Sequence, residues 1–173
     1  MGAWRHRPGV VTAAVLVVGS LTLCGCTLGQ VGPPATQVTN WMSTSADGAA
    51  IGQVEVDSQN IALALAHRDA PSEIKTVCAL LTTDAQTAIG NLPSPDTTLT
   101  DDLNTAYEEA AAAGTDCYNG ASGGSLLRRS AAERKKIAPL LSVAVDRVAT
   151  ITGHTPSTST TMASGAGDDP FGN

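Results

Sequence analysis

The chain has 173 residues, with 10 basic and 16 acidic residues, a formal net charge of −6 at pH 7, and only 3% aromatic residues. This length is typical of one domain. An acidic chain is a poor partner for nucleic acid, because phosphate neutralisation needs a Lys- and Arg-rich surface. Since aromatic residues are few, Ala, Leu, Val and Ile must fill the core, and such side chains pack closely and leave little room for a ligand pocket.

The N-terminal residues have the three-part layout of an export signal. Residues 1–9 contain Arg5 and Arg7 and no acid, residues 10–23 form an apolar run of 14 residues, and small residues and cysteines follow. This order is typical of a secretory signal. A permanent membrane span needs about 20 apolar residues, so the run is too short for one. The alternative of a buried core helix does not account for the flanking residues.

The sequence Leu23-Cys24-Gly25-Cys26 resembles the lipobox of bacterial lipoprotein signals, with an aliphatic residue three before the modified cysteine and a small residue directly before it. The resemblance implies that residues 1–25 are removed as a signal peptide and that Cys26 is acylated. Two or three acyl chains would hold the protein on the membrane, since each buried methylene contributes about 0.8 kcal/mol. The alternative is cleavage at a small-x-small site, which would release a soluble protein.

Two segments of the mature chain have the composition of unstructured regions. Residues 26–39 are rich in Gly, Pro and Thr without periodicity, which predicts a flexible tether. Residues 153–173 are polar and rich in Gly, Ser and Thr, and they contain too few apolar groups to offset the entropy lost on ordering. We therefore expect a disordered C-terminal tail.

Residues 40–152 are expected to form the folded domain, an all-α, antiparallel up-down bundle of about four helices. Short connections between helices favour antiparallel neighbours. In the first helix, apolar positions recur at steps of three and four along one face, with Asp57 expected on another face and Trp41 at or before the start. The positions of the apolar face are Ile51, Val54, Ser58, Ile61 and Leu65.

The second and third helices are separated by the Pro-containing turn 90–95. Asp69 is a candidate N-cap of the second helix, with Pro71 in its first turn, and Asp96 is a candidate N-cap of the third. The second apolar stripe is Ile74, Val77, Cys78, Leu81, Ala85 and Ala88, and the third is Leu99, Leu103, Ala106, Ala110, Ala113 and Cys117.

The fourth helix is expected to open near Ser125, and the sequence from Ser130 to Glu133 matches a capping box that could reopen it. A proline inside a helix removes one hydrogen bond and costs about 3 kcal/mol. Pro139 therefore predicts either a kink near Lys135 or two shorter helices. The predicted apolar face is Leu127, Ala131, Arg134, Ala138, Leu141, Val145, Val148 and Thr152.

Cys78 and Cys117 lie on the apolar stripes of neighbouring predicted helices. An exported domain occupies an oxidising space, which favours a disulfide between them. A symmetric hairpin about residue 95 would place Cys117 about 7 Å too far along its helix, so the helices must be offset or the loop asymmetric. Two free buried thiols are the main alternative, and a metal site lacks further ligands.

Some short motifs match catalytic signatures without the context that these need. Residues 120–124 match G-x-S-x-G around Ser122, but no strand precedes them. Ser72 to Lys75 match S-x-x-K at a helix start, where serine is common for capping. His67 lies at a helix end and His154 in the tail. The sequence shows no acid, histidine and nucleophile in an arrangement typical of a catalytic triad. We therefore predict no catalytic residue, no metal and no cofactor.

The segment 128–136, RRSAAERKK, holds five of the eight basic residues of the mature chain. On a membrane-tethered protein it could contact anionic head groups. The simpler interpretation is a charged solvent face that balances the acidic remainder, with the adjacent acidic pairs at 101–102 and 108–109 also solvated.

A lipobox, a Pro-containing tether, Trp41 and two cysteines flanking the turn Leu92–Asp96 together resemble small cell-envelope lipoproteins of mycobacteria and related actinobacteria. The resemblance implies an envelope location and a helical fold, and it does not imply any particular activity. The leading hypothesis is a non-catalytic, lipid-anchored protein on the extracytoplasmic face of the cell membrane that works through contacts with an envelope partner. The alternatives are a helical carrier for a lipid or other hydrophobic ligand, which would need an internal cavity, and an enzyme.

Overall fold

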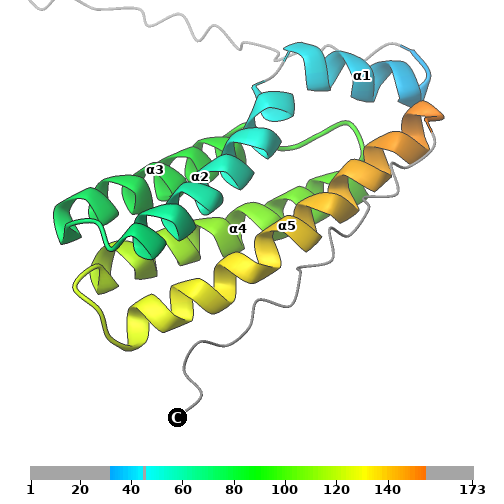
Figure 1. Ribbon diagram of the computed structural model, residues 1–173. Coiled ribbons are helices and arrows are strands. Elements are labelled where there is room, and N and C mark those ends of the chain that lie inside the picture. Colours follow the sequence, from blue (N-terminus) through cyan, green and yellow to red (C-terminus); the bar gives the residue numbers. More distant parts are fainter. Residues whose placement is uncertain (1–31, 45, 155–173) are drawn as a thin grey trace, which may run out of the picture.

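The computed structural model describes residues 32–44 and 46–154, which are all-helical and contain no strand. The α2–α3 pair lies over the α4–α5 pair, and α1 lies across one end (Figure 1). The described residues form five helices rather than about four: α1 Pro34–Thr44, α2 Asp47–His67, α3 Pro71–Gly90, α4 Thr97–Gly120 and α5 Ser125–Thr152.

The additional helix is α1, which includes residues 34–39 of the predicted tether. Pro34 occupies its first position, where a missing N–H leaves no helical hydrogen bond unmade. Val38 and Trp41, three residues apart, are buried together, and α1 contacts α5 and α2. The tether prediction was therefore wrong for residues 34–39, because packing against helices distant in sequence orders a segment whose composition alone is unfavourable.

The N-terminus of α3 is closed by Glu73 rather than by the predicted Asp69. The Glu73 carboxylate accepts a hydrogen bond from the backbone N–H of Ala70, at 3.0 Å, and Ala70 is the N-cap residue. Pro71 lies at the start of the helix, as expected. A glutamate at the third position also interacts favourably with the positive end of the helix dipole.

The prediction that Asp96 caps α4 is confirmed. Its carboxylate accepts a hydrogen bond from the N–H of Leu99, at 2.8 Å. The preceding turn is held by Ser94, whose hydroxyl donates to the Asp96 carbonyl at 2.6 Å and whose N–H donates to the Thr100 hydroxyl at 2.9 Å. These contacts fix the direction in which the chain enters α4.

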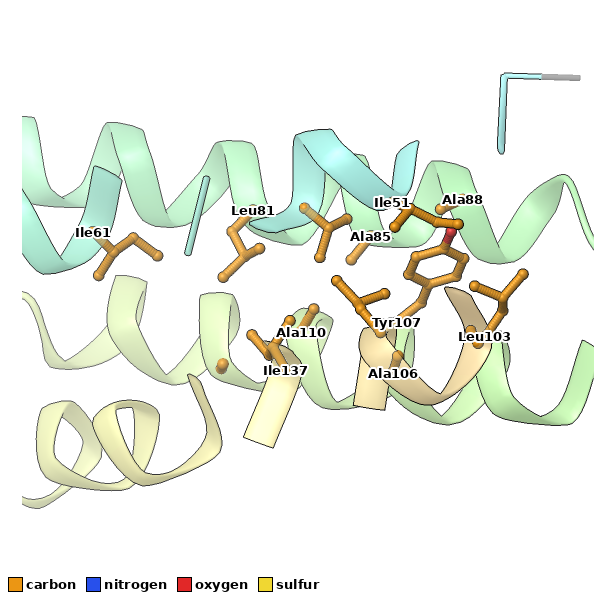
Figure 2. Close-up of a cluster of buried hydrophobic side chains, with 14 of the residues drawn as sticks. Ile51, Ile61, Leu81, Ala85, Ala88, Leu103, Ala106, Tyr107, Ala110 and Ile137 are labelled. Atoms are coloured by element: carbon orange, nitrogen blue, oxygen red, sulfur yellow. The ribbon is translucent and has the colours of Figure 1, made fainter. Parts of the chain in front are cut away.

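The core is densest around α4, which packs against α3 on one side and α5 on the other. The predicted apolar stripes of α3 and α4 are buried at every position except Val77, which is half-buried. Figure 2 shows Leu81 and Ala85 of α3 facing Tyr107 and Ala110 of α4, with side chains of α2 and α5 closing the cluster. The many alanines allow the helices to lie close together without leaving voids.

Helices α4 and α5 run antiparallel, as a series of cross-helix contacts shows. The Ser130 hydroxyl donates to the Ala113 carbonyl at 2.7 Å, and Arg147 contacts Asp96 near the opposite end. Residue numbers rise along one helix as they fall along the other. Ser130 is 0% exposed in the second turn of an uninterrupted α5, so the predicted capping box at this position is wrong.

Helix α5 is continuous from Ser125 to Thr152 with Pro139 inside it, so the predicted division into two helices is wrong. Pro139 and Lys135, whose carbonyl would have bonded to residue 139, both lie on the solvent-exposed side. Water can satisfy the freed carbonyl there. Burial of Ile137 and Leu141 on either side of Pro139 holds the helix in place.

The predicted apolar face of α5 agrees with the observed one at Leu141 and Arg134 and differs at most of its other positions. Ala138 and Val145, expected to be buried, are exposed, and Leu127, Ala131, Val148 and Thr152 are only half-buried. The buried positions are Ser130, Ile137, Leu141 and Ala144. Arg134 is four residues from Ser130 and three from Ile137, so it lies on this buried stripe.

Candidate functional site

The predicted lipid attachment point, Cys26, lies outside the described residues, as do the signal peptide 1–25 and residues 155–173 of the predicted tail. The described chain begins at Gly32 and enters α1, a helix that contains no charged residue. None of the described helices is long and apolar enough to cross a membrane. Acylation of Cys26 therefore stays a prediction.

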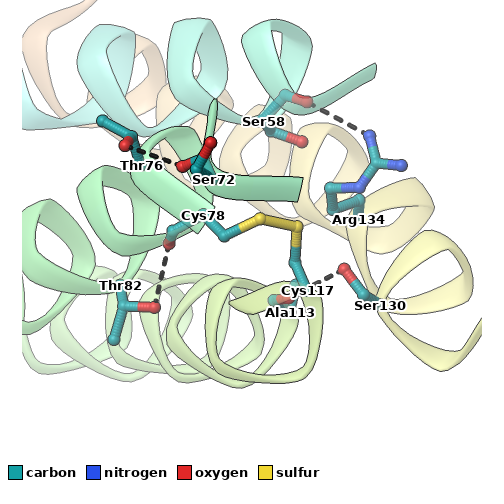
Figure 3. Close-up of a disulfide and its surroundings, with 9 residues drawn as sticks. All are labelled: Ser58, Ser72, Thr76, Cys78, Thr82, Ala113, Cys117, Ser130 and Arg134. Carbon is teal, nitrogen blue, oxygen red and sulfur yellow. Dashed lines mark hydrogen bonds between the residues drawn. A yellow bond between two sulfur atoms is a disulfide. The ribbon is translucent and has the colours of Figure 1, made fainter. Parts of the chain in front are cut away.

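Cys78 of α3 and Cys117 of α4 form a disulfide inside the core, with their Cα atoms 5.6 Å apart (Figure 3). This separation is within the range that a disulfide can bridge. The sequence left open whether the two helices are offset or their loop is asymmetric, and the structure shows an offset. Gly114 of α4 lies against Thr82 of α3, one turn away from the bridge. The predicted Cys78–Cys117 bridge is thus present.

The candidate catalytic side chains of these motifs, Ser72, Lys75 and Ser122, are solvent-exposed, as are His67 and His154. Ser72 lies in the first turn of α3, where its carbonyl accepts a hydrogen bond from the Thr76 hydroxyl, and Ser122 lies in the turn between α4 and α5. His67 is in the last turn of α2, and His154 follows α5 with its ring nitrogen 2.9 Å from the Thr152 hydroxyl. Within residues 32–44 and 46–154, no group of three or more His, Cys, Asp or Glu side chains could hold a metal ion.

The basic run 128–136 is paired with α4 at two points. Arg129 binds Asp116 through two guanidinium nitrogens, and Lys136 Nζ lies 2.6 Å from the Glu109 carboxylate. Burial and the neighbouring Asp116 raise the pKa of Glu133, which lies one turn beyond Arg129. These pairings favour the interpretation of the run as a charged face that balances the acids of α4.

At the other end of α5, Arg147 forms a second bidentate pair with Asp96. The two nitrogen–oxygen distances are 3.1 and 2.8 Å. The hydrogen bond from Arg147, together with that from the Leu99 N–H, lowers the pKa of Asp96. One carboxylate therefore caps α4 and ties it to α5.

A buried carboxylate lies between α2 and α3. Asp57, which the sequence pattern placed away from the core, is 2% exposed. It accepts a hydrogen bond from the Gln53 amide at 3.0 Å. Burial and a hydrogen-bonding contact with Asp84 of α3 raise the pKa of Asp57, because a second carboxyl nearby disfavours its charge.

A groove of about 410 Å³ runs between α2 and α5. Glu55, Ser58 and Gln59 of α2 line one side. Arg134 and Lys135 line the other, and the floor between them is apolar, made by Ala62, Ala131, Ile137 and Ala138.

Arg134 is the half-buried charged group of this groove. One terminal nitrogen donates to the Ser58 carbonyl at 3.2 Å (Figure 3). Its Nε is buried and has no hydrogen-bond partner among the described residues. Burial lowers the pKa of Arg134, since it disfavours the charged guanidinium. Its position differs from that of Arg129, Lys136 and Arg147, each of which has a carboxylate partner.

The outer face of α3 and α4 carries a different surface feature. Leu80 and Tyr118 are 48% and 44% exposed and line a shallow groove of about 500 Å³ together with Lys75 and Thr76. The Lys75 ammonium lies 5.3 Å from the centre of the Tyr118 ring, a cation–π arrangement. Large apolar side chains that lie together on a solvent-exposed surface are typical of protein contact sites.

Sequence reasoning missed Asp57 as a core-facing charge. A signal was available for it, because it lies three residues after Val54 and four before Ile61, both of which are fully buried. Arg134 was placed on the predicted apolar face of α5, but the pattern did not show that its guanidinium lies beside the Ser58 carbonyl of α2.

No protein-family model, no curated protein and no solved structure matches this chain.

Proposed function

We propose that this chain is a lipid-anchored protein of the extracytoplasmic face of the cell membrane, held by acyl chains on Cys26. Its folded part is an antiparallel up-down helical bundle of the kind found in small actinobacterial envelope lipoproteins. It works through contacts with an envelope protein rather than through catalysis. The lipobox Leu23–Cys26 supports the anchor.

The observation that carries this proposal is the Cys78–Cys117 disulfide in the middle of the core. Structural disulfides persist in oxidising compartments and are rare in the cytosol, where thiols are kept reduced. A buried bridge between two helices therefore agrees with export, which the N-terminal signal predicts independently. The two features lie more than fifty residues apart and point to the same location.

A function through protein contacts is supported by the difference between the charged groups, which stabilise the fold, and the apolar groups, which remain exposed. Asp96 and Asp116 are bound by arginines of α5 and hold the fold together. Leu80 and Tyr118, in contrast, leave large apolar surface in water beside Lys75. Aromatic residues such as tyrosine are enriched at protein interfaces, so this face of α3 and α4 is suited to contact with a partner.

The anchor is tested by labelling the protein with palmitate in cells that express the full chain. Wild-type protein and the matched control Cys24→Ala are expected to incorporate the label, because Cys24 leaves with the signal peptide. Cys26→Ala is expected to lose it. Label retained in Cys26→Ala, or absent from wild type, would contradict the proposed anchor.

The contact is tested by in-cell photo-crosslinking from single positions. A photoreactive residue in place of Leu80 is expected to give a discrete adduct with an envelope protein. The same residue in place of Thr105, an exposed polar position of α4, is the control and is expected to give none. Equal crosslinking from both positions would indicate random encounters.

The carrier hypothesis would need a cavity between the helices. Leu81, Leu103 and Tyr107 are fully buried where the helices meet. The grooves found, of about 250 to 500 Å³, lie between neighbouring helices at the surface. The structure therefore favours contact at the surface over an enclosed ligand.

A further inference from the structure

We propose that the groove between α2 and α5 is a binding site for a fatty acid of medium chain length, with its carboxylate on Arg134. This goes beyond the proposed function, because the groove is remote in sequence from Cys26 and its occupancy does not depend on the anchor. The inference starts from the charge of Arg134.

A half-buried guanidinium is costly unless its donors are satisfied. Arg134 has five N–H donors, and its hydrogen bond within the described residues goes to one backbone carbonyl, that of Ser58. Its Nε is buried and unpartnered. A carboxylate matches the planar fork of a guanidinium and forms charge-assisted hydrogen bonds that a neutral carbonyl does not replace. No carboxylate of the described residues forms an ion pair with Arg134, which leaves its place open to an anion from outside the chain.

The charge of the groove selects a monoanion. Arg134 and Lys135 bring two positive charges, and Glu55 on the opposite side brings one negative charge. Glu55 is exposed, and its recorded partner is the Gln59 amide, at 3.5 Å. One positive charge therefore remains to be balanced, which suits a carboxylate better than a dianionic phosphate, since Glu55 would repel the second charge.

The remainder of the groove suits an alkyl chain. Beside Arg134 the lining consists of the methyl groups of Ala62, Ala131 and Ala138 and the side chain of Ile137. These small residues form an apolar strip, and an alkyl chain lying on it would be removed from water. Along α2 the lining spans residues 55 to 62, about 10 Å at 1.5 Å per residue. The strip is short, which favours a medium chain.

The test uses a decanoic acid that carries a photoreactive diazirine on its chain. Membranes from cells that express the full chain are irradiated with this probe, and the labelled peptides are mapped by mass spectrometry. We expect labelling on residues 55–62 and 131–138. Arg134→Gln should reduce it about tenfold or more, because a hydrogen bond to a charged group contributes about 1.5–3 kcal/mol.

Matched controls separate binding from loss of the fold. Arg128→Gln removes a charge from the same basic run outside the groove and should leave labelling unchanged. Ala62→Trp fills the groove at an exposed position without altering Arg134, and should also abolish labelling. Thermal unfolding of each variant shows whether the domain is intact. The acylation state of Cys26 is read from the N-terminal peptide in the same spectra, so failure of the anchor and failure of the groove are distinguishable.

Three results would overturn the proposal. The first is equal groove labelling of wild type and a folded Arg134→Gln variant. The second is equal labelling by a decanol probe with the same diazirine, which lacks the carboxylate. No labelling of residues 55–62 or 131–138 in wild type would also overturn it.

Discussion

The close approach of α3 and α4 predicts that alanine substitutions at two helical glycines act in opposite directions. A Cβ added at Gly114 would lie 2.4 Å from the Thr82 hydroxyl oxygen, 2.8 Å from the Thr82 nitrogen and 2.9 Å from the Cys78 carbonyl oxygen. A Cβ added at Gly52 of α2 would meet nothing within 4 Å. Both positions lie inside helices, so the gain in helix propensity is the same and packing decides the sign.

For Gly52→Ala, the expected effect is a gain of about 0.5–1 kcal/mol in the free energy of unfolding. For Gly114→Ala the same gain is offset by overpacking, which costs about 1–3 kcal/mol. The upper end applies, because two of the three close atoms are backbone and the Cys78–Cys117 bridge one turn away limits how far the helices can separate. The net result is a loss of about 2 kcal/mol.

Urea unfolding followed by the helical circular dichroism signal measures both effects. Since the slope for a small protein is about 1–3 kcal/mol per molar urea, the midpoints of the two variants should differ by roughly 1 M or more. An unchanged slope confirms that the variants unfold from comparable states. If Gly114→Ala is as stable as Gly52→Ala, α3 and α4 do not approach as closely as described and the register at Cys78 is wrong.

Three further predictions concern the disulfide and the titrating carboxylates. The double variant Cys78→Ala/Cys117→Ala should lose about 4 kcal/mol in urea unfolding, since the bridge closes a loop with a sequence separation of 39; a loss below about 1 kcal/mol would contradict this. Asp57→Asn should stabilise the protein at pH 7. The folded state raises the pKa of Asp57 above 3.8, so the stability of the wild type falls as the pH rises from 3.8 through the folded pKa. Unfolding curves at pH 4 and 7 should show that the stability gained by the variant is smaller at pH 4. Asp96→Asn keeps a capping side chain but loses the charge that binds Arg147, so it should destabilise the protein at pH 7. Because the folded state lowers the pKa of Asp96, the stability that this carboxylate contributes is lost as the pH falls below 3.8 through the folded pKa. Below that pKa the variant should be as stable as the wild type. Destabilisation by Asp57→Asn at pH 7 would refute the first of these two assignments, and stabilisation by Asp96→Asn would refute the second.

The sequence predicted α3 and α4 well because their stripes are unambiguous. Leu81 and Leu103, with small residues at the neighbouring core positions, mark one face each, and a proline-rich turn with Asp96 separates them. The bridge between Cys78 and Cys117 followed from those stripes. In this part of the chain the residues that are apolar in the sequence are also the ones that are buried, so the periodicity alone was sufficient to predict the two helices.

Helices α1 and α5 were harder because local signals there are weak. Alanines occur on several faces of α5, so no single stripe stands out, and its rotation is set by contacts such as that of Ser130 with Ala113. Helix α1 forms against α5, which lies about a hundred residues away in the chain. Its formation depends on tertiary packing that composition does not show.

The candidate groove could not be predicted for a related reason. Arg134 and Ser58 are 76 residues apart in sequence, and they meet because α2 and α5 are brought to the same side of the domain. The sequence pattern placed Arg134 on the apolar face of its helix, but it does not show which other helix that face meets. Asp57 was recognisable in principle from Val54 and Ile61, but the neighbouring Ser58 fitted the pattern equally well.

The central claim, that the domain is held outside the membrane by acyl chains on Cys26, is tested most directly by the mass of the N-terminal peptide of protein extracted from membranes. The account predicts a peptide that begins at Cys26 and carries acyl chains, with residues 1–25 absent. An unmodified N-terminus at another residue, or an intact Met1 start, would contradict it.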